Sequence, residues 1–226
     1  MCHTSCIAFG ARAVRPDEIE GKRVLEVGAR DVNGSLRSVY EHYRPSEYVG
    51  IDLEAGRGVD VLCDAGEVHE HFGEDRFDLV ISTELLEHVR DWRAVVSSMK
   101  RVCAPGGTLL VTTRSRGFPY HSFMGDFWRY EIGDAEQIFS DFDLDVLERD
   151  PQQPGIFLKA RKPAELSEAD LSDLALYSVV TRRRERELPT AALTSLSVRF
   201  RSATWQVVDF LDFLKRVLHV LLRRTS

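Results

Sequence analysis

The sequence has few of the features that mark secreted, membrane-spanning or nucleic-acid-binding proteins. Its four cysteines are scattered over 226 residues and do not suggest the disulfide framework of a small secreted domain. No apolar run reaches the ~18 residues that a membrane-spanning helix requires. The first ten residues have neither a basic start nor a long apolar stretch, so no signal peptide is evident. We therefore expect a cytoplasmic protein in a reducing environment.

Basic charge is also scarce. The net charge is −6, whereas a surface that binds nucleic acid is expected to be basic, so we expect no nucleic-acid partner. The charge is uneven, because residues 163–226 carry ten basic and eight acidic side chains and the rest of the chain carries the acidic excess. The hydrophobic content of 43% is sufficient for a substantial core.

One stretch near the N-terminus has the pattern of a βαβ unit. An apolar strand over 24–27 is followed by a turn at Gly28, a helix after Ser35 and a second strand over 47–51. Asp52 ends that second strand about 20 residues beyond the turn, where nucleotide-binding folds place a carboxylate that accepts hydrogen bonds from ribose hydroxyls. The pattern predicts a site for a nucleoside or a dinucleotide.

Strands and helices continue to alternate along the chain. We expect helices over 36–43, 67–71, 92–103 and 133–139, and strands over 59–62, 77–82, 108–112, 142–148 and 155–160. The strand over 77–82 is apolar almost throughout, which is typical of a strand covered on both faces in a parallel sheet.

Five short motifs carry a resemblance to a known family. They are Glu26-Val27-Gly28, residues 77–82 (FDLVIS), residues 84–89 (ELLEHV), Pro105-Gly106-Gly107 and residues 126–130 (DFWRY). Their order and spacing resemble the class I S-adenosylmethionine (SAM) dependent methyltransferases often labelled type 11. The resemblance implies a Rossmann-like α/β fold, with a seven-stranded, mostly parallel sheet, an antiparallel last strand and helices on both faces.

The resemblance covers roughly residues 22–161 and suggests three parts. We expect an N-terminal cap segment over 1–21, a SAM-binding methyltransferase domain over 22–162 and a helical C-terminal extension over 163–226. The cap segment includes a short helix within residues 1–14. Cys2, His3 and Cys6 in this segment lack a fourth ligand nearby, so no metal site is predicted there.

The sequence departs from the family's fuller glycine pattern, E/D-x-G-x-G-x-G. Arg30 and Val32 stand where the second and third glycines would be, and Gly34 is displaced. Glycine serves at such positions because it lets the backbone approach a ligand closely. Asn33-Gly34 can still form a left-handed turn, and Ser35 is a suitable N-cap for the following helix.

The resemblance assigns eight positions to SAM. The methionine amine would lie against Glu26, the carboxypropyl arm against Gly28, and the ribose hydroxyls against Asp52. The other assigned positions are Leu53 against the adenine ring, Asp64 and Ala65 at the adenine edge, and Thr83 and Glu84 beside the methyl donor. Two of these residues have a second interpretation. Glu26 could be a buried acid paired with a Lys or Arg, and Asp64 could cap the helix over 67–71.

The loop over 114–131 is rich in aromatic and polar residues, and we expect it to form the acceptor side. His121 is our preferred general base, and His88 is either a second candidate or a structural residue. Asp126 could orient His121 or bind a divalent ion, and the sequence leaves a metal requirement open. The residues expected to bind the substrate are Tyr120, Trp128 and Tyr130, which would stack on the acceptor or form a hydrophobic cluster, and Arg129, which would pair with Glu87 or with an anionic acceptor.

The C-terminal tail lies outside the resemblance. Ser167-Glu168-Ala169-Asp170 predicts a capping box and a helix, and residues 182–187 form a charge run that we interpret as a solvated face. From about Thr204 the spacing predicts a long amphipathic helix. Its broad apolar face favours packing within the chain or in a homodimer over lying on a membrane surface, which the acidic Asp209 and Asp212 disfavour.

The function we expect is SAM-dependent methyl transfer to a small molecule, with a hydroxyl of a sugar or secondary metabolite as the leading acceptor. A membrane-associated lipid or quinone methyltransferase is a variant of this hypothesis. A nicotinamide-dependent oxidoreductase is disfavoured because the chain has no G-x-G-x-x-G and no Tyr-x-x-x-Lys pair. A non-catalytic binding protein stays open because of Arg30 and Val32.

Overall fold

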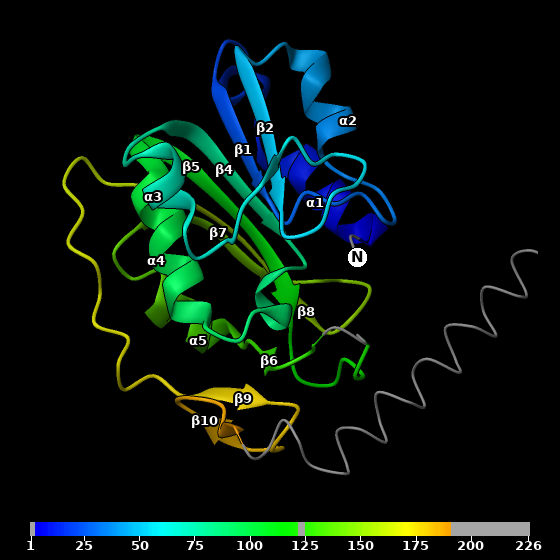
Figure 1. Ribbon diagram of the computed structural model, residues 1–226, viewed down its shortest axis with the longest axis vertical. Helices are drawn as coiled ribbons and strands as arrows, with labels where there is room; N and C mark the ends of the chain where they lie inside the picture. The colour runs from blue at the N-terminus through cyan, green and yellow to red at the C-terminus, as the bar shows by residue number, and fades with distance from the viewer. Residues whose placement is uncertain (1–2, 122–124, 191–226) are drawn as a thin grey trace, which may run out of the picture.

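The central element of the fold is a seven-stranded sheet with the order β3-β2-β1-β4-β5-β8-β7 (Figure 1). The computed structural model describes residues 3–121 and 125–190. The first five strands are parallel, and β8 is antiparallel to both β5 and β7. The strands are β1 (Arg23–Val27), β2 (Glu47–Asp52), β3 (Val61–Leu62), β4 (Phe77–Thr83), β5 (Cys103–Arg114), β7 (Asp143–Arg149) and β8 (Gly155–Arg161). The predicted α/β fold is confirmed.

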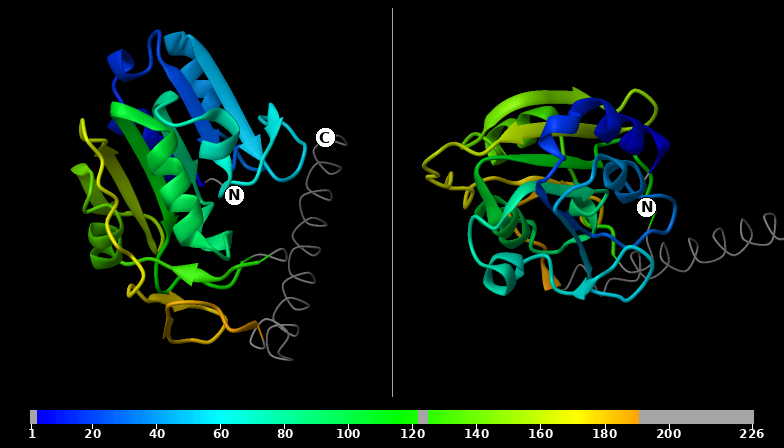
Figure 2. Two further views of the ribbon diagram at one scale, coloured as in Figure 1. Left: turned by 60° about the vertical axis from the view of Figure 1, so that its left-hand side comes forward. Right: turned by 90° about the horizontal axis from the view of Figure 1, so that it is seen from above.

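Helices cover both faces of this sheet, as expected (Figure 2). Because strand side chains alternate, Leu79 and Ile81 of β4 face one core, while Val80 faces the other. The first core lies under α1 (Thr4–Ala13), the 3₁₀ turn Pro16–Glu18 and α2 (Arg37–Tyr40). The second lies under α3 (Val68–Phe72), α4 (Trp92–Val102) and α5 (Ile132–Ile138).

The N-terminal helix α1 packs directly on the sheet. Phe9 stacks on Phe157 of β8 with ring centroids 4.7 Å apart, and the Tyr40 hydroxyl donates a hydrogen bond of 2.9 Å to the Gly10 carbonyl. The imidazole of His3 accepts from the Ser5 amide and caps the helix. None of the residues of α1 lines the two cavities described below, so its role as a cap over the cofactor stays a prediction.

The helix α4 follows its prediction closely. Asp91 caps it by accepting a hydrogen bond of 3.2 Å from the Ala94 amide, and Lys100 and Arg101 lie in the last turn, where basic groups favour the helix dipole. Met99 and Val102 are fully buried against the sheet. The predicted helix over 36–43 instead divides into α2 and a 3₁₀ turn, Glu41–Tyr43.

A second, small sheet joins the tail to the loop after β5. Its order is β10-β9-β6, with β6 (Trp128–Arg129), β9 (Leu176–Ser178) and β10 (Arg184–Glu185). The strands are antiparallel, and Figure 1 places this sheet below the main one. The Arg93 guanidinium of α4 also fixes the tail, because it donates hydrogen bonds to the carbonyls of Leu171, Leu174 and Arg186.

The helix predicted at Ser167-Glu168-Ala169-Asp170 is wrong, since this segment is neither helix nor strand. The Ala169 amide donates to the Asp141 carboxylate, and the Asp170 carboxylate accepts from the Ser172 amide. Side chains therefore take the backbone amides that a helix would need. The charge run at 182–187 includes β10, and its side chains are exposed apart from the half-buried Glu185, as expected of a solvated face. Within it, Arg184 pairs with the buried Asp134.

The amphipathic helix predicted from Thr204, and with it the expected homodimer contact, lies outside the described residues. Among the residues that are described, no helix has the length and apolar character needed to cross a membrane. The three-part division at residues 21 and 162 stays a prediction.

Candidate active site

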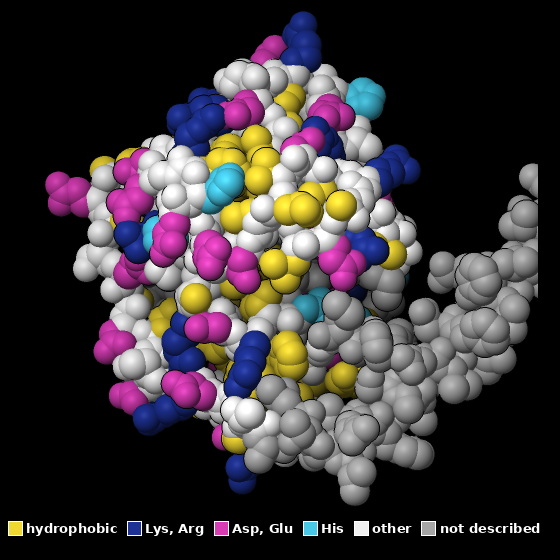
Figure 3. All heavy atoms as spheres, in the orientation of Figure 1, with side chains coloured by type: hydrophobic (Ala, Val, Ile, Leu, Met, Phe, Trp, Pro, Cys, Tyr) yellow, Lys and Arg dark blue, Asp and Glu magenta, His cyan; other side chains and the backbone are white. Residues whose placement is uncertain are grey.

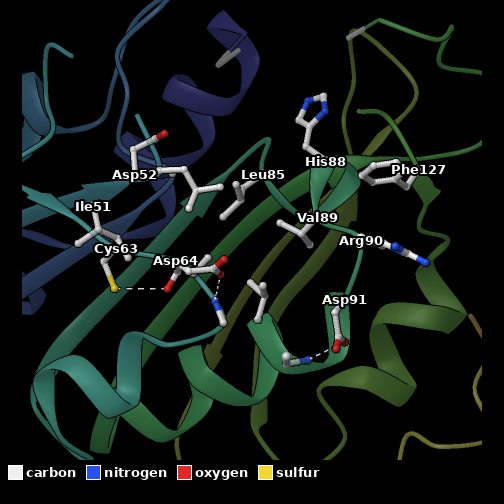
Figure 4. A pocket seen from close by; sticks show the side chains of 16 residues that line it. Ile51, Asp52, Cys63, Asp64, Leu85, His88, Val89, Arg90, Asp91 and Phe127 are labelled. Carbon is white, nitrogen blue, oxygen red and sulfur yellow. Dashed lines mark hydrogen bonds between the residues drawn. The ribbon is translucent and has the colours of Figure 1, made fainter. Parts of the chain in front are cut away.

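Two cavities open at the carboxyl ends of β1, β2 and β4, where open α/β sheets bind their ligands. Their volumes are about 440 Å³ and about 240 Å³. Both are lined by Gly28, Asp52, Leu85 and His88, so they are two halves of one groove. Figure 4 shows three of these residues, Asp52, Leu85 and His88, around the larger half. The face in Figure 3 mixes hydrophobic and charged side chains.

The smaller half of the groove contains a buried carboxylate at the end of β1. Glu26 is 2% exposed and accepts hydrogen bonds of 2.8 Å from the Tyr48 hydroxyl and 3.0 Å from the Ser35 hydroxyl. Within the described chain no Lys or Arg donates a hydrogen bond to it, so the alternative of a simple buried ion pair is not what the structure contains. Burial raises the pKa of Glu26 to about 7. A cationic ligand beside this carboxylate would supply the missing positive charge.

The turn after β1 needs a glycine at one position. Gly28 has φ +80°, and a Cβ there would lie 3.1 Å from the side chain of Leu85, so the turn is both left-handed and close to the neighbouring loop. The next residues build the loop without the family's other two glycines. The Asp31 carboxylate accepts from the Gly34 amide at 2.7 Å, and Gly34 takes the left-handed conformation with φ +118°.

Asp52, at the end of β2, faces both halves of the groove. Its Oδ2 accepts a hydrogen bond of 3.3 Å from the Arg30 amide, and its Oδ1 accepts one of 3.1 Å from the Glu54 amide. Arg30 thus contributes its backbone to the position where the family pattern has glycine. These two amides fix the Asp52 carboxylate at the rim of the groove, and each carboxylate oxygen keeps a lone pair for a ligand hydroxyl.

The larger half of the groove is lined by the residues expected at the adenine. Leu53, Asp64 and Ala65 all border it, and Leu53 is 70% exposed. The Asp64 Oδ1 accepts a hydrogen bond of 2.8 Å from the Gly66 amide. The helix α3 begins only after Glu67, which is its N-cap, so Asp64 does not cap that helix. The alternative interpretation of Asp64 is therefore wrong.

Thr83 ends β4 and Glu84 follows it, and both residues line the smaller half of the groove. Glu84 is in the left-handed conformation with φ +57°, which is strained for a residue with a side chain. The strain is held by a buried network, because the Glu84 carboxylate pairs with Arg114 and accepts from the Thr112 hydroxyl at 3.2 Å. Arg114 in turn contacts Asp150 at 3.4 Å.

A cluster of three polar side chains adjoins the groove through His88, which lines both halves. Glu87 and His88 come from the 3₁₀ turn Leu86–His88, and His121 comes from the loop after β5. The His88 Nε2 and the His121 Nε2 each lie 3.9 Å from the Glu87 Oε1. The imidazole rings are 4.7 Å apart between centroids. Burial lowers the pKa of His88, so this imidazole is neutral near pH 7.

Asp126 orients His121, which is one of the two roles expected for it. Its Oδ2 accepts hydrogen bonds of 3.0 Å from both the amide and the Nδ1 of His121. Asp126 also forms a two-pronged ion pair with Arg129. Although burial opposes ionisation, the hydrogen bonds from Arg129 and His121 hold the pKa of Asp126 well below its usual range. The predicted pairing of Arg129 with Glu87 is therefore wrong.

The structure places the expected substrate-binding residues mainly in the core. Trp128 and Tyr130 are each 1% exposed, and they donate to the Arg90 and Leu86 carbonyls. Neither ring offers a face to an acceptor, so the hydrophobic-cluster alternative describes them. Arg129 is also 1% exposed. Tyr120 is half-buried, and its part in substrate binding stays a prediction.

Comparisons with known proteins agree with this geometry. A family model described as "Methyltransferase domain" matches residues 3–155. The chain belongs to that methyltransferase family. The resemblance to class I SAM-dependent methyltransferases is thus confirmed, and SAM is the cofactor that the family uses. The nicotinamide-dependent alternative is not retained.

The curated relatives cover only part of the chain. The ubiquinone biosynthesis O-methyltransferase of Idiomarina loihiensis is 33% identical over 113 residues, which is 44% of this chain and 45% of that protein. The protein of the same name from Klebsiella pneumoniae is 27% identical over 173 residues, 71% of this chain and 64% of that protein. The chain spans about half the length of the first of these relatives.

Solved structures share the fold at low identity. The 1,6-didemethyltoxoflavin-N1-methyltransferase of Burkholderia thailandensis, solved with 1,6-didemethyltoxoflavin and S-adenosylhomocysteine, has a TM-score of 0.58 and 15% identity over 70% of this chain and 78% of that one. A SAM-dependent methyltransferase from Mesorhizobium loti has a TM-score of 0.53 and 17% identity over 70% of this chain and 98% of that one.

The structure brings to the site several residues that the sequence motifs do not indicate. Tyr48 and Ser35 hold Glu26, Phe127 and Val89 line the larger cavity, and Thr113 donates to Glu87. Glu87 itself was considered only as a partner for Arg129. Its position next to His88 in the ELLEHV motif was the signal available for it.

Proposed function

We propose that this protein transfers a methyl group from SAM to a hydroxyl oxygen of a small molecule. The observation that carries the proposal is the groove at the sheet edge, which runs from Asp64 past Asp52 to the buried carboxylate of Glu26. Of the Glu87–His88–His121 cluster, His88 lines both halves, and Glu87 and His121 lie behind it.

Each part of SAM has a matching part of the groove. The adenine fits the larger half, between Leu53 and Asp64, and the ribose hydroxyls fit the Asp52 carboxylate at the shared rim. The methionine ammonium fits the smaller half beside Glu26, which among the described residues accepts side-chain hydrogen bonds from two hydroxyls and from no Lys or Arg. This placement sets the sulfonium near His88, which borders both halves.

The chemistry needs little from the protein beyond alignment and proton removal. The acceptor oxygen forms a bond to the methyl carbon, the carbon–sulfur bond breaks, and its electron pair stays on sulfur as S-adenosylhomocysteine forms. Alignment of two bound reactants can contribute ~7–11 kcal/mol in the best intramolecular models. The hydroxyl proton leaves toward the polar cluster beside the groove, and such proton transfer typically contributes 10²–10⁴-fold.

The acceptor class is the finer part of the proposal. The leading acceptor is a hydroxyl of a sugar or secondary metabolite. The names of the ubiquinone biosynthesis relatives support oxygen as the atom methylated, and they favour a lipid or quinone precursor as the second candidate. Leu85, Val89 and Phe127 give the groove beside the cluster an apolar wall that suits an organic ring.

Calorimetry and product analysis test the proposal. We expect SAM and S-adenosylhomocysteine to bind with measurable heat and NADH to give none. We then expect S-adenosylhomocysteine to form with at least one class in a panel of monosaccharides, phenols and hydroxyquinones. No heat with SAM or its product would overturn the proposal, and binding without turnover across the panel would favour the non-catalytic alternative.

A further inference from the structure

The cluster beside the groove has the composition of a metal site. The Glu87 Oε1, the His88 Nε2 and the His121 Nε2 all lie within 4.8 Å of one another. We propose that these three atoms bind one divalent transition-metal ion at the acceptor end of the groove. Two imidazoles and one carboxylate form a common ligand set for such ions, and three protein ligands leave positions open for water or substrate.

The hydrogen bonds of the two histidines fix which ring nitrogen is free. The His88 Nδ1 lies 2.6 Å from the Gly125 carbonyl oxygen, which can only accept, so Nδ1 carries the proton. The His121 Nδ1 lies 3.0 Å from the Asp126 carboxylate and donates to it in the same way. With its proton on Nδ1, each ring can present a lone pair on Nε2, which is the atom that faces the cluster.

Glu87 adds a third acceptor to the same point. Its Oε2 accepts a hydrogen bond of 2.8 Å from the Thr113 hydroxyl, whereas its Oε1 has no hydrogen-bond partner among the described residues. The side chain is fully buried. A buried carboxylate oxygen without a donor is costly, and two imidazole lone pairs beside it add no donor. A cation between the three atoms would satisfy all of them at once.

The two Glu87–histidine spacings require only a small adjustment. An ion ~2.1 Å from each ligand would hold tetrahedral ligand atoms roughly 3.4 Å apart. The two Glu87–histidine distances of 3.9 Å are about half an ångström longer, which side-chain rotation can supply. The nitrogen-rich set favours zinc, cobalt, iron(II) or manganese over magnesium, which prefers oxygen ligands and bound water.

The residues around the cluster behave as supports for the ligands. Metal-binding histidines usually donate their other N–H to a carboxylate or carbonyl, and both histidines do so here. Asp126 is itself fixed by its ion pair with Arg129. The Asp126–Arg129 pair would thus act by orienting His121 and would not need to contact the substrate.

The role of the ion rests on the proposed function. An acceptor hydroxyl that occupies an open position on the ion would lose its proton more readily, because a bound divalent cation lowers the pKa of a coordinated water or hydroxyl. In the metal-bound form the proton would pass to solvent water, because the Nε2 atoms of both histidines would hold the ion. The existence of the site does not depend on methyl transfer and can be measured separately.

Cobalt(II) is the probe for the test, because it gives a visible absorption spectrum when bound by nitrogen ligands. We would treat the untagged full chain with a chelator, remove the chelator, and titrate cobalt(II) with calorimetry and absorption in parallel. The expected result is one ion per chain. Glu87→Gln should lower the affinity at least tenfold, and Thr113→Val, which removes a support of Glu87, should lower it by about 10-fold or more.

His42→Ala is the matched control, because His42 is an exposed histidine that is not part of the cluster. SAM affinity and thermal unfolding of each variant show whether it is folded. Absence of binding to the unaltered chain, or equal binding by the folded Glu87→Gln variant, would overturn the metal site. Cobalt binding without SAM binding would instead overturn the proposed function and leave the site standing.

Discussion

The two ends of the groove are built in different ways. The cofactor end takes its residues from the ends of strands that are close in sequence, with Glu26 at β1 and Asp52 at β2. The acceptor end is assembled from a 3₁₀ turn, from β5 and from a loop that the tail strand β9 covers. The first arrangement follows from the βαβ unit itself, whereas the second exists only when distant segments have packed. Variants at the two ends should therefore affect different quantities.

The largest effect is expected at the acceptor end. His121→Ala removes an imidazole from the Glu87–His88–His121 cluster, so turnover should fall by roughly 10²–10⁴-fold, the range typical for loss of assisted proton transfer. SAM affinity should change little, because His121 lines neither half of the groove. Initial rates and calorimetry measure the two quantities. Turnover within a few-fold of the unaltered enzyme would remove this cluster from the chemistry.

The next largest effect is expected on stability, at the Asp126–Arg129 ion pair in the loop after β5. Arg129→Met leaves the buried Asp126 carboxylate without its cation, and breaking such a pair costs about 3–5 kcal/mol of unfolding free energy. Urea denaturation measures the change. Arg116→Met is the control on the same loop, since Arg116 is exposed and should change stability by less than about 0.5 kcal/mol. Equal losses for both variants would contradict the assigned role.

At the cofactor end the expected change is in affinity alone. Glu26→Gln keeps the shape but removes the charge opposite the methionine ammonium, so SAM affinity should fall by about 10- to 100-fold, corresponding to ~1.5–3 kcal/mol for a charged hydrogen bond. Turnover at saturating SAM should stay close to that of the unaltered enzyme. Asp17→Asn, at an exposed carboxylate outside the groove, is the matched control. A fall in turnover without a change in SAM affinity would contradict the assignment of Glu26 to cofactor binding.

The smallest effect is a pH dependence at the same residue. The free protein holds Glu26 with a pKa of about 7, and an ammonium ligand favours the ionised form, so SAM affinity should rise with pH up to about 7. At one pH unit below that value, SAM should bind about tenfold more weakly than it binds to the protein with Glu26 fully ionised. The unfolding free energy of the protein without SAM should change with pH in the opposite direction. Because the pKa is raised on folding, stability falls as pH rises from the ordinary Glu range to about 7.

Calorimetry at pH 6, 7 and 8 tests this dependence, with Glu26→Gln as the reference. The variant should bind SAM weakly and without that slope. A slope that persists in Glu26→Gln would assign the titration to another group.

The sequence predicted the main sheet correctly, and the residues it assigned to the cofactor line the groove. Glu26 and Asp52 were predicted because each lies at the carboxyl end of its strand, and the hydrophobic pattern of the sequence locates the strands. Asp64 and Ala65 lie in the groove for the same reason.

The acceptor end could not be predicted in the same way. The sequence left Trp128 and Tyr130 between stacking on an acceptor and forming a hydrophobic cluster. The structure buries both residues, and Trp128 lies in β6, which pairs with β9 about 48 residues later in the chain. The role of Glu87 depends on its contacts with Thr113 and His121, which are distant in sequence. At Ser167 local helix chemistry was overridden, because Asp141 from another segment takes the backbone amide of Ala169.

The pairing of β6 with β9 also decides where this chain can be shortened. A cut after Lys162 would match the edge of the recognisable domain but would remove β9, leaving the backbone of Trp128 and Arg129 as an open strand edge. Open edges recruit other chains into aggregates. The shortest soluble fragment should therefore extend through Glu185, and a fragment trimmed to the family boundary should precipitate.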